Sequence, residues 1–210
     1  MPTYLVRVWL PDRPGALGQV ASRIGAVRGD VVGIEILERG AGRAVDELVV
    51  ALPEDGLLDL LVAEISEVDG VDVEDVRTLG SDRHDPGLTA LATATRLMES
   101  DDDTTVLKVL CEHTVADFEC DWAVALRLSP AELLIQVGEA PSAPWVAAFV
   151  LGSRHLDTGA DGDAGPHDVA WADLPRAGLG LAVGRKGRPF RWRERRQLAA
   201  LAHIADLRLP

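Results

Sequence analysis

Residues 8–17 read VWLPDRPGAL, and this stretch decides how the N-terminal half of the chain is organised. The run from Tyr4 to Leu10 alternates in apolar character and predicts a strand, which the turn after it breaks. Pro14 favours a helix start, because its fixed φ suits the first helical turn and its missing N–H is not needed there. Apolar residues then recur at the spacing of an amphipathic helix: Leu17, Val20, Ala21, Ile24 and Val27.

The residues that follow this helix predict a hairpin, a second helix and a last strand. Residues 31–37 and 45–52 are rich in β-branched side chains and flank a turn cluster at 38–42. Residues 53–56 open a helix that Gly70 stops, and the last strand covers residues 71–76. The order β-α-β-β-α-β predicts a ferredoxin-like fold, with two helices on one face of a four-stranded antiparallel sheet. That order is common and does not by itself decide function.

The turn between the first strand and the first helix carries more information. The stretch VWLPDRPGAL resembles the signature of the ACT family, and the resemblance runs over residues 3–79. It implies a regulatory domain with a small-molecule site, usually for an amino acid, and side-by-side pairing of two domains into one continuous sheet. In that family the second strand of the other subunit forms the second wall of the site. Here that strand holds Val31, Val32, Gly33, Ile34 and Glu35.

The physics of the loop fits a ligand with a carboxylate. Gly15 lets the backbone approach a ligand closely, and the amides of Gly15, Ala16 and Leu17 are expected to lack acceptors within the helix. Free N–H groups at the positive end of a helix dipole suit an acid group, while Asp12 can take an ammonium. The expected loop contacts are Asp12, Arg13, Pro14, Gly15, Ala16 and Leu17.

A structural interpretation of the same residues stays open. A Pro-Gly turn before a helix is often only a turn, and Asp12 is of a type that caps helices. A glycine inside a strand, such as Gly33, marks either a close approach or a bulge. Some members of the ACT family keep only the dimer contact.

Residues 80–87 are polar and rich in helix breakers, which predicts a linker between domains at 1–79 and 88–210. The second half resembles a GAF domain over about residues 86–207, most visibly at its end. That end reads LAVGRKGRPF at 181–190, followed by Glu194 and a Leu- and Ala-rich helix. The resemblance implies an α/β domain with a central antiparallel sheet. No N-K-F-D-E motif is present, so a cyclic-nucleotide site is not expected. The roles that remain for this domain are dimerisation and the binding of an unidentified ligand.

Other clusters in the second half are better explained without chemistry. Cys111 and His113 flank Glu112 on an expected helix, where residues two apart point in different directions. The acidic loop at 157–168 lacks the spacing of a calcium loop. The basic cluster at 185–196 reads as a salt-bridged or solvated face, although an anionic ligand or a nucleic acid is the alternative. Trp145 and Trp171 are expected either to pack in the core of the second domain or to line a pocket there.

Composition narrows the class of protein. The chain has 210 residues and a formal charge of −13, which disfavours general binding to nucleic acid or to anionic membranes. No apolar run approaches the roughly 20 residues of a membrane span, no signal peptide is recognised, and two cysteines make no disulfide framework. A cytoplasmic protein is expected.

Together these features predict an α+β, non-catalytic sensor that binds a free amino acid or similar small ligand at the interface of a homodimer. Neither a cofactor nor a metal is expected, and the C-terminal domain is available for a protein partner. The alternative is a dimerisation or interaction module without a ligand. An enzyme with a site near His155 and Trp171 is disfavoured, because no reactive group has a recognisable activating partner.

Overall fold

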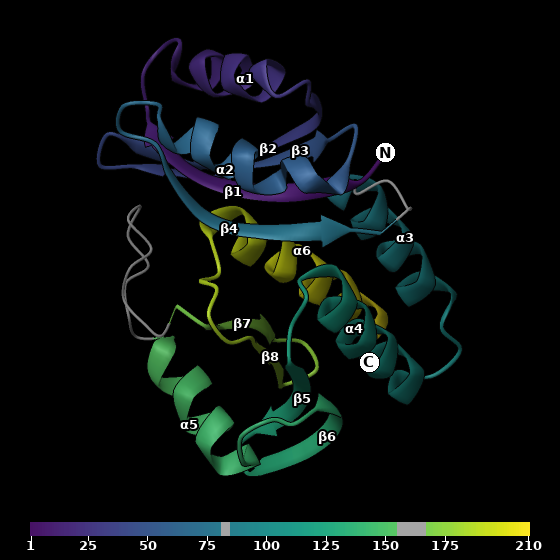
Figure 1. The fold of residues 1–210 in the computed structure, drawn as a ribbon. Coiled ribbons are helices and arrows are strands. Elements are labelled where there is room, and N and C mark those ends of the chain that lie inside the picture. Colours follow the sequence, from purple (N-terminus) through teal and green to yellow (C-terminus); the bar gives the residue numbers. More distant parts are fainter. Residues whose placement is uncertain (81–84, 155–166) are drawn as a thin grey trace. The chain divides into compact units, whose positions relative to one another are not determined.

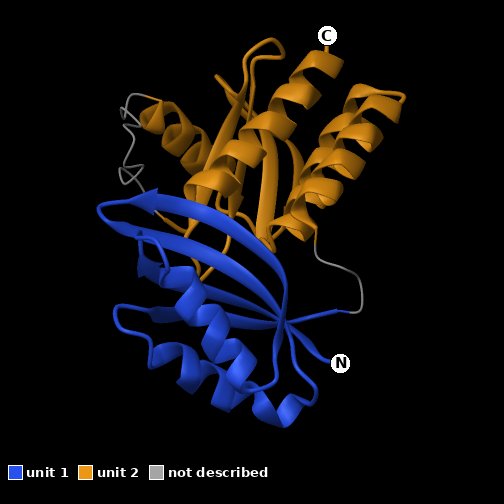
Figure 2. Ribbon diagram, turned by 90° about the horizontal axis from the view of Figure 1, so that it is seen from above, with its two compact units in different colours: residues 1–84 blue, residues 85–210 orange. Residues whose placement is uncertain are grey.

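The structure, a computed structural model, describes residues 1–80, 85–154 and 167–210. The chain divides into two compact units, Met1–His84 and Asp85–Pro210, which Figure 2 colours separately. Each unit has its own sheet and its own core, and each is described by itself.

The first unit follows the expected β-α-β-β-α-β order (Figure 1). Its elements are β1 (Thr3–Pro11), α1 (Ala16–Ala26), β2 (Asp30–Gly40), β3 (Arg43–Ala51), the single 3-10 turn η1 (Asp55–Leu57), α2 (Leu58–Ser66) and β4 (Asp72–Leu79). The sheet has the order β2-β3-β1-β4, and every neighbouring pair is antiparallel. The prediction of an α+β chain with a ferredoxin-like N-terminal half is therefore confirmed.

Both helices of this unit cover the same face of the sheet. The even-numbered side chains of β1 point to that face and form the core with Val20 and Ile24 of α1 and with Leu61 and Ile65 of α2. The β1 residues concerned are Tyr4, Val6, Val8 and Leu10. The β3 residues on the same face are the even-numbered ones, since β1 and β3 pair with Val8 opposite Asp46.

The hairpin between β2 and β3 is longer than the sequence predicted. β2 continues to Gly40, so the connection shrinks from the expected residues 38–42 to Ala41 and Gly42, which have φ of 50° and 76°. Two residues with positive φ match the right-handed twist of paired strands, which allows the ladder to extend to the turn. The second α-helix also begins later than expected, because η1 precedes it.

The second unit places two helices before a strand pair and one helix at its end. Its elements are α3 (Pro86–Glu99), α4 (Asp103–Asp117), β5 (Trp122–Leu128), β6 (Ala131–Gly138), α5 (Ala143–Ser153), β7 (Val169–Leu174), β8 (Leu179–Gly184) and α6 (Trp192–Arg208). α3 starts at Pro86, inside the linker expected at 80–87, because the Asp85 side chain caps it by accepting from the Leu88 amide at 3.0 Å.

The second sheet is also four-stranded and antiparallel, in the order β6-β5-β8-β7. Side chains of β5 alternate between two cores. Ala123 and Ala125 belong to the core with α4 and α6, whereas Val124 and Leu126 belong to the core with α5. β7 was not predicted as a strand.

Among the described residues, no helix is long and apolar enough to cross a membrane.

Candidate functional site

The loop from β1 to α1 is held in place by its own backbone. The Asp12 amide donates to the carbonyl of Gly42 at 2.9 Å, which ties the loop to the β2–β3 turn. The Arg13 amide donates to Pro11 O at 2.8 Å, and the Ala16 amide donates to Arg13 O at 3.3 Å. The loop is therefore a defined turn that backbone hydrogen bonds hold together.

Gly15 is the residue that turns the chain into α1. It is the N-cap, with φ of 89° in the left-handed region, and no side chain caps the helix. A residue other than glycine is strained in that conformation. Pro14 consequently lies before the cap, and the expectation that it begins the helix is wrong. The alternative that Asp12 caps the helix is also excluded.

Two of the three expected backbone donors have no partner. Among the residues that the structure describes, the amides of Gly15 and Leu17 make no hydrogen bond. The Ala16 amide, by contrast, is engaged by Arg13 O, and the Ala16 side chain is buried. Asp12, Arg13, Pro14 and Gly15 are exposed, while Leu17 packs partly against the core. The loop therefore presents unused donors at the positive end of an 11-residue helix.

On β3 the structure buries a carboxylate that the sequence analysis did not single out. Asp46 lies on β3 opposite Val8, on the face that α1 and α2 cover. Its residue exposure is 3%, and its Oδ1 atom has no hydrogen-bond partner among the described residues. The signal was an acidic pair, Asp46 and Glu47, inside an otherwise apolar strand.

Electrostatics link Asp46 to the loop. Burial raises the pKa of the Asp46 carboxyl above its ordinary value of 3.8, the positive charge of Arg39 lowers it, and the negative charge of Asp12 raises it further. Asp12 and Arg39 are exposed, so the buried carboxylate has one acidic and one basic neighbour at the rim.

The expected second wall lies on β2, which is an edge strand of the sheet. Val32 and Ile34 are 58% and 51% exposed, whereas Val31, Gly33 and Glu35 are half-buried. The register shifts between Val31 and Gly33, so the alternative that Gly33 marks a bulge is correct. A Cβ on Gly33 would lie 3.2 Å from Val49 Cγ2, which means that this glycine also accommodates a close side chain of β3.

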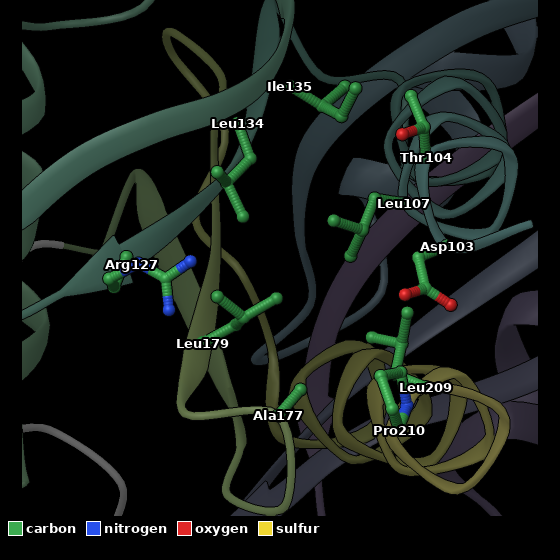
Figure 3. Close-up of a pocket in the computed structure, with 10 residues that line it drawn as sticks. All are labelled: Asp103, Thr104, Leu107, Arg127, Leu134, Ile135, Ala177, Leu179, Leu209 and Pro210. Atoms are coloured by element: carbon green, nitrogen blue, oxygen red, sulfur yellow. The ribbon is translucent and has the colours of Figure 1, made fainter.

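The second unit contains a separate cavity of about 390 Å³ (Figure 3). Leu107, Leu134 and Leu179 form apolar walls, and Asp103 and Arg127 lie on opposite sides of it. Arg127 Nε already donates to Glu132 Oε2 at 3.1 Å. Because the Arg127 guanidinium is paired with Glu132 and the walls are aliphatic, the cavity does not indicate a particular ligand chemistry.

The other clusters considered in the sequence have structural roles where they are described. Burial raises the pKa of the Cys111 thiol to about 12, which leaves it a thiol at neutral pH. His113 Nδ1 instead lies 3.1 Å from Thr93 Oγ1, which joins α3 to α4. No group of three or more metal-binding side chains occurs in the described ranges. His155, Asp157, Asp161 and Asp163 lie outside the described residues.

Arg185 and Arg191 are the buried members of the basic cluster, and Arg185 is the more deeply buried of the two. Its guanidinium donates to the carbonyls of Phe118, Arg188 and Pro189 and to Glu194 Oε1, at distances of 2.7–3.0 Å. These bonds fix the turn after β8 to the start of α6. The cluster is thus salt-bridged at Arg185, which agrees with the interpretation that the sequence favoured.

Comparisons with known proteins identify no family for this chain. No family model and no curated protein matches it. Among solved structures it is similar to the ACT domain of GTP pyrophosphokinase from Chlorobium tepidum, with 19% identity, TM-score 0.31, and coverage of 38% of this chain and 100% of that one. The C-terminal domain of the MgtC protein from Mycobacterium tuberculosis matches at 19% identity and TM-score 0.31, covering 40% of this chain and 95% of that one.

An unknown protein from Galdieria sulphuraria covers 98% of this chain and 92% of its own length, at 13% identity and TM-score 0.35. These identities are too low to transfer a ligand or an activity. None of the three structures is described as a GAF domain, so the GAF resemblance of the second unit stays a prediction.

Replacing Asp46 by Asn should change how stability depends on pH. A carboxyl whose pKa is raised in the folded state binds more protons when folded, so its contribution to stability falls as pH rises from 3.8 through the folded pKa. We expect the stability of Asp46→Asn, relative to the parent, to increase over that interval, as measured by urea unfolding between pH 3.5 and about 7.

Asp102→Asn is the matched control, because the Thr105 hydroxyl bonded to it lowers the pKa of Asp102. Its stability relative to the parent should fall as pH rises through the lowered pKa toward 3.8, and should stay nearly constant over the higher interval in which Asp46→Asn changes. A constant difference between Asp46→Asn and the parent at all pH values would contradict the assignment of a raised pKa.

Proposed function

We propose that the first unit is a regulatory module that binds a free amino acid or a similar small carboxylate at the loop from Asp12 to Leu17. The observation that carries the proposal is the pair of unbonded amides at Gly15 and Leu17, at the positive end of α1. A carboxylate placed there would accept hydrogen bonds from both amides and would interact favourably with the helix dipole. Exposure of Asp12 to Gly15 leaves the donors within reach of solvent.

The proposal includes a homodimer in which β2 of each subunit pairs with its partner. β2 is an edge of the sheet, and it carries exposed apolar side chains at Val32 and Ile34. Edge strands with such side chains are templates for pairing with a second chain. A dimer of this kind would bring Val31 to Glu35 of the other copy to the loop and would enclose the ligand.

The chain as a whole is proposed to act as a cytoplasmic, non-catalytic sensor. The second unit, GAF-like by its sequence resemblance, would contact a protein partner or a second copy. Ligand binding would alter that contact only to the extent that it favours one arrangement of the protein over another. The alternative function is a dimerisation module without a ligand, which the exposed edge of β2 also fits.

A panel of the twenty common amino acids, followed by thermal unfolding, tests ligand binding. A compound present at about 100 times its Kd should add about 2.7 kcal/mol to the free energy of unfolding. The variant Gly18→Asp should lose at least tenfold in affinity, because it adds a negative charge to the first turn of α1, where a Cβ meets no other atom within 4 Å.

Gly25→Asp is the matched control, since it makes the same charge change in the last turn of the same helix. It should bind as the parent does. No stabilisation of the parent by any amino acid, or equal losses in both variants, would overturn binding at the loop.

The subunit contact has its own test. Ile34→Lys should shift the protein from dimer to monomer in sedimentation equilibrium, because a charge on the paired edge opposes association. Leu60→Lys removes an apolar side chain of similar exposure on α2 and should leave the dimer intact. A monomeric parent, or an Ile34→Lys variant that stays dimeric, would rule out pairing through β2.

A further inference from the structure

The outer face of α3 carries a stripe of exposed side chains that is mostly apolar. Leu88 and Leu91 are each 65% exposed, Met98 is 59% exposed, and Thr95 between them is exposed as well. Their spacings of three, four and three residues place the four side chains in one row along the helix. Single apolar side chains on a surface are ordinary, whereas a continuous row is typical of a contact surface.

The opposite face of α3 already belongs to the core of the second unit. Thr93 and Leu97 are fully buried there, and Leu97 shares its core with Leu198 and Leu201 of α6. The exposed row is therefore not what holds α3 in place. A helix that is apolar on two faces has one face left for a partner once the other is packed.

The spacing of the row indicates what kind of partner it fits. Apolar residues that alternate at three and four residues form the seam along which one α-helix packs against another. α3 holds only two charged residues, Arg96 and Glu99, and both lie in its last turn. Because the whole chain has a formal charge of −13, two copies repel each other over much of their surface, and this row is a place where they can meet.

α6 lies beside α3 and runs in the same direction (Figure 1). Their C-terminal ends are joined by Arg208, whose Nη2 atom donates to the carbonyl of Ser100 at 2.6 Å. Leu88 and Arg196 precede Ser100 and Arg208, respectively, by 12 residues, which is about 18 Å along a helix. The Leu88 end of the row on α3 is therefore next to the first turns of α6.

The two ends of the surface formed by α3 and α6 carry opposite charges. Glu99 and Asp101 are exposed beside Met98 at the C-terminal end. Arg193 and Arg196 are exposed at the other end, where α6 begins. The helix dipoles have the same polarity, because both helices begin at the basic end and finish at the acidic end.

Each end has an excess of one sign rather than one sign alone. Arg96 is also exposed near the acidic end, where Asp102 and Asp103 follow and add negative charge. Asp85 is exposed near the basic end, and its carboxylate accepts from the Leu88 amide at 3.0 Å. The surface is therefore negative at one end, positive at the other and largely uncharged between them.

We propose that the surface formed by α3 and α6 binds the same surface of a second copy of this chain, with α3 of each copy antiparallel to α6 of the other. A two-fold axis perpendicular to the helices places each basic end against the acidic end of the other copy. It also brings the Leu88 end of one copy to the exposed Leu207 of the other. A parallel arrangement would instead put like charges together.

This inference rests on the proposed function, in which the second unit contacts another chain, and it names that chain and the surface used. It requires no ligand at the loop after β1. The contact and the pairing through β2 act in the same dimer, so a variant at either place should weaken association.

The test measures the Kd of the full-length dimer by sedimentation equilibrium. Leu91→Lys places a charge in the middle of the row and should raise the Kd by about tenfold or more. Leu151→Lys is the matched control, since it makes the same change at an exposed leucine of α5 in the same unit. It should change the Kd by less than about threefold.

A charge exchange tests the antiparallel orientation. Arg196→Glu and Glu99→Lys should each raise the Kd by about tenfold, because each brings like charges together across the contact. The double variant restores opposite charges and should return the Kd to within about threefold of the parent. Circular dichroism checks that every variant is folded, and Leu91→Gln repeats the first test if Leu91→Lys is not.

Each other outcome contradicts part of this account. A dimer in which Leu91→Lys has the Kd of the parent while Ile34→Lys is monomeric would overturn the α3 contact and leave the proposed function intact. Weakening by Leu151→Lys but not by Leu91→Lys would assign the contact to α5. A double variant as weak as the single ones would exclude the antiparallel arrangement, and a monomeric parent would overturn both this inference and the proposed dimer.

Discussion

The left-handed backbone at Gly15 is the constraint on which the first unit's site depends. With φ of 89° this residue ends the loop from β1 and lets α1 begin at Ala16 without a capping side chain. A capping Ser, Thr or Asp would use the first-turn amides for the protein's own side chain. Because Gly15 has none, the amides of Gly15 and Leu17 are left for another acceptor. The same turn places the start of α1 on the sheet face that bears Asp46.

Polar groups without a protein partner occur at two places in the first unit. A buried carboxylate oxygen without a partner, as at Asp46, costs about 1–3 kcal/mol of stability, whereas the uncapped start of α1 lies at the exposed Gly15. Arg185 in the second unit, by contrast, has its hydrogen-bond donors satisfied, because its guanidinium is bonded to three carbonyls and a carboxylate. A fully satisfied charge fixes a structure, whereas the unbonded amides at the start of α1 remain available to donate hydrogen bonds to a ligand.

Local patterns in the sequence were sufficient for most of the first unit. The alternation in β1, the apolar stripe of α1 and the turn at Pro14 and Gly15 predicted its element order. The extent of β2 was missed, because the positive φ of Ala41 permits a tight hairpin that composition does not reveal. β7 was missed because a six-residue strand with Asp173 near its end has a weak alternation. Asp46 was missed because burial depends on packing by distant elements, and an acidic residue within a strand reads as solvent-facing.

The most direct measurement of the central claim is an amide NMR titration of the ¹⁵N-labelled full chain with the amino acid that stabilises it most. We expect the largest shift changes at the amides of Gly15 and Leu17, and smaller ones at Ala16, whose amide is already bonded to Arg13 O. Changes concentrated instead around Leu107 and Arg127 in the second unit, with the loop unaffected, would contradict this claim.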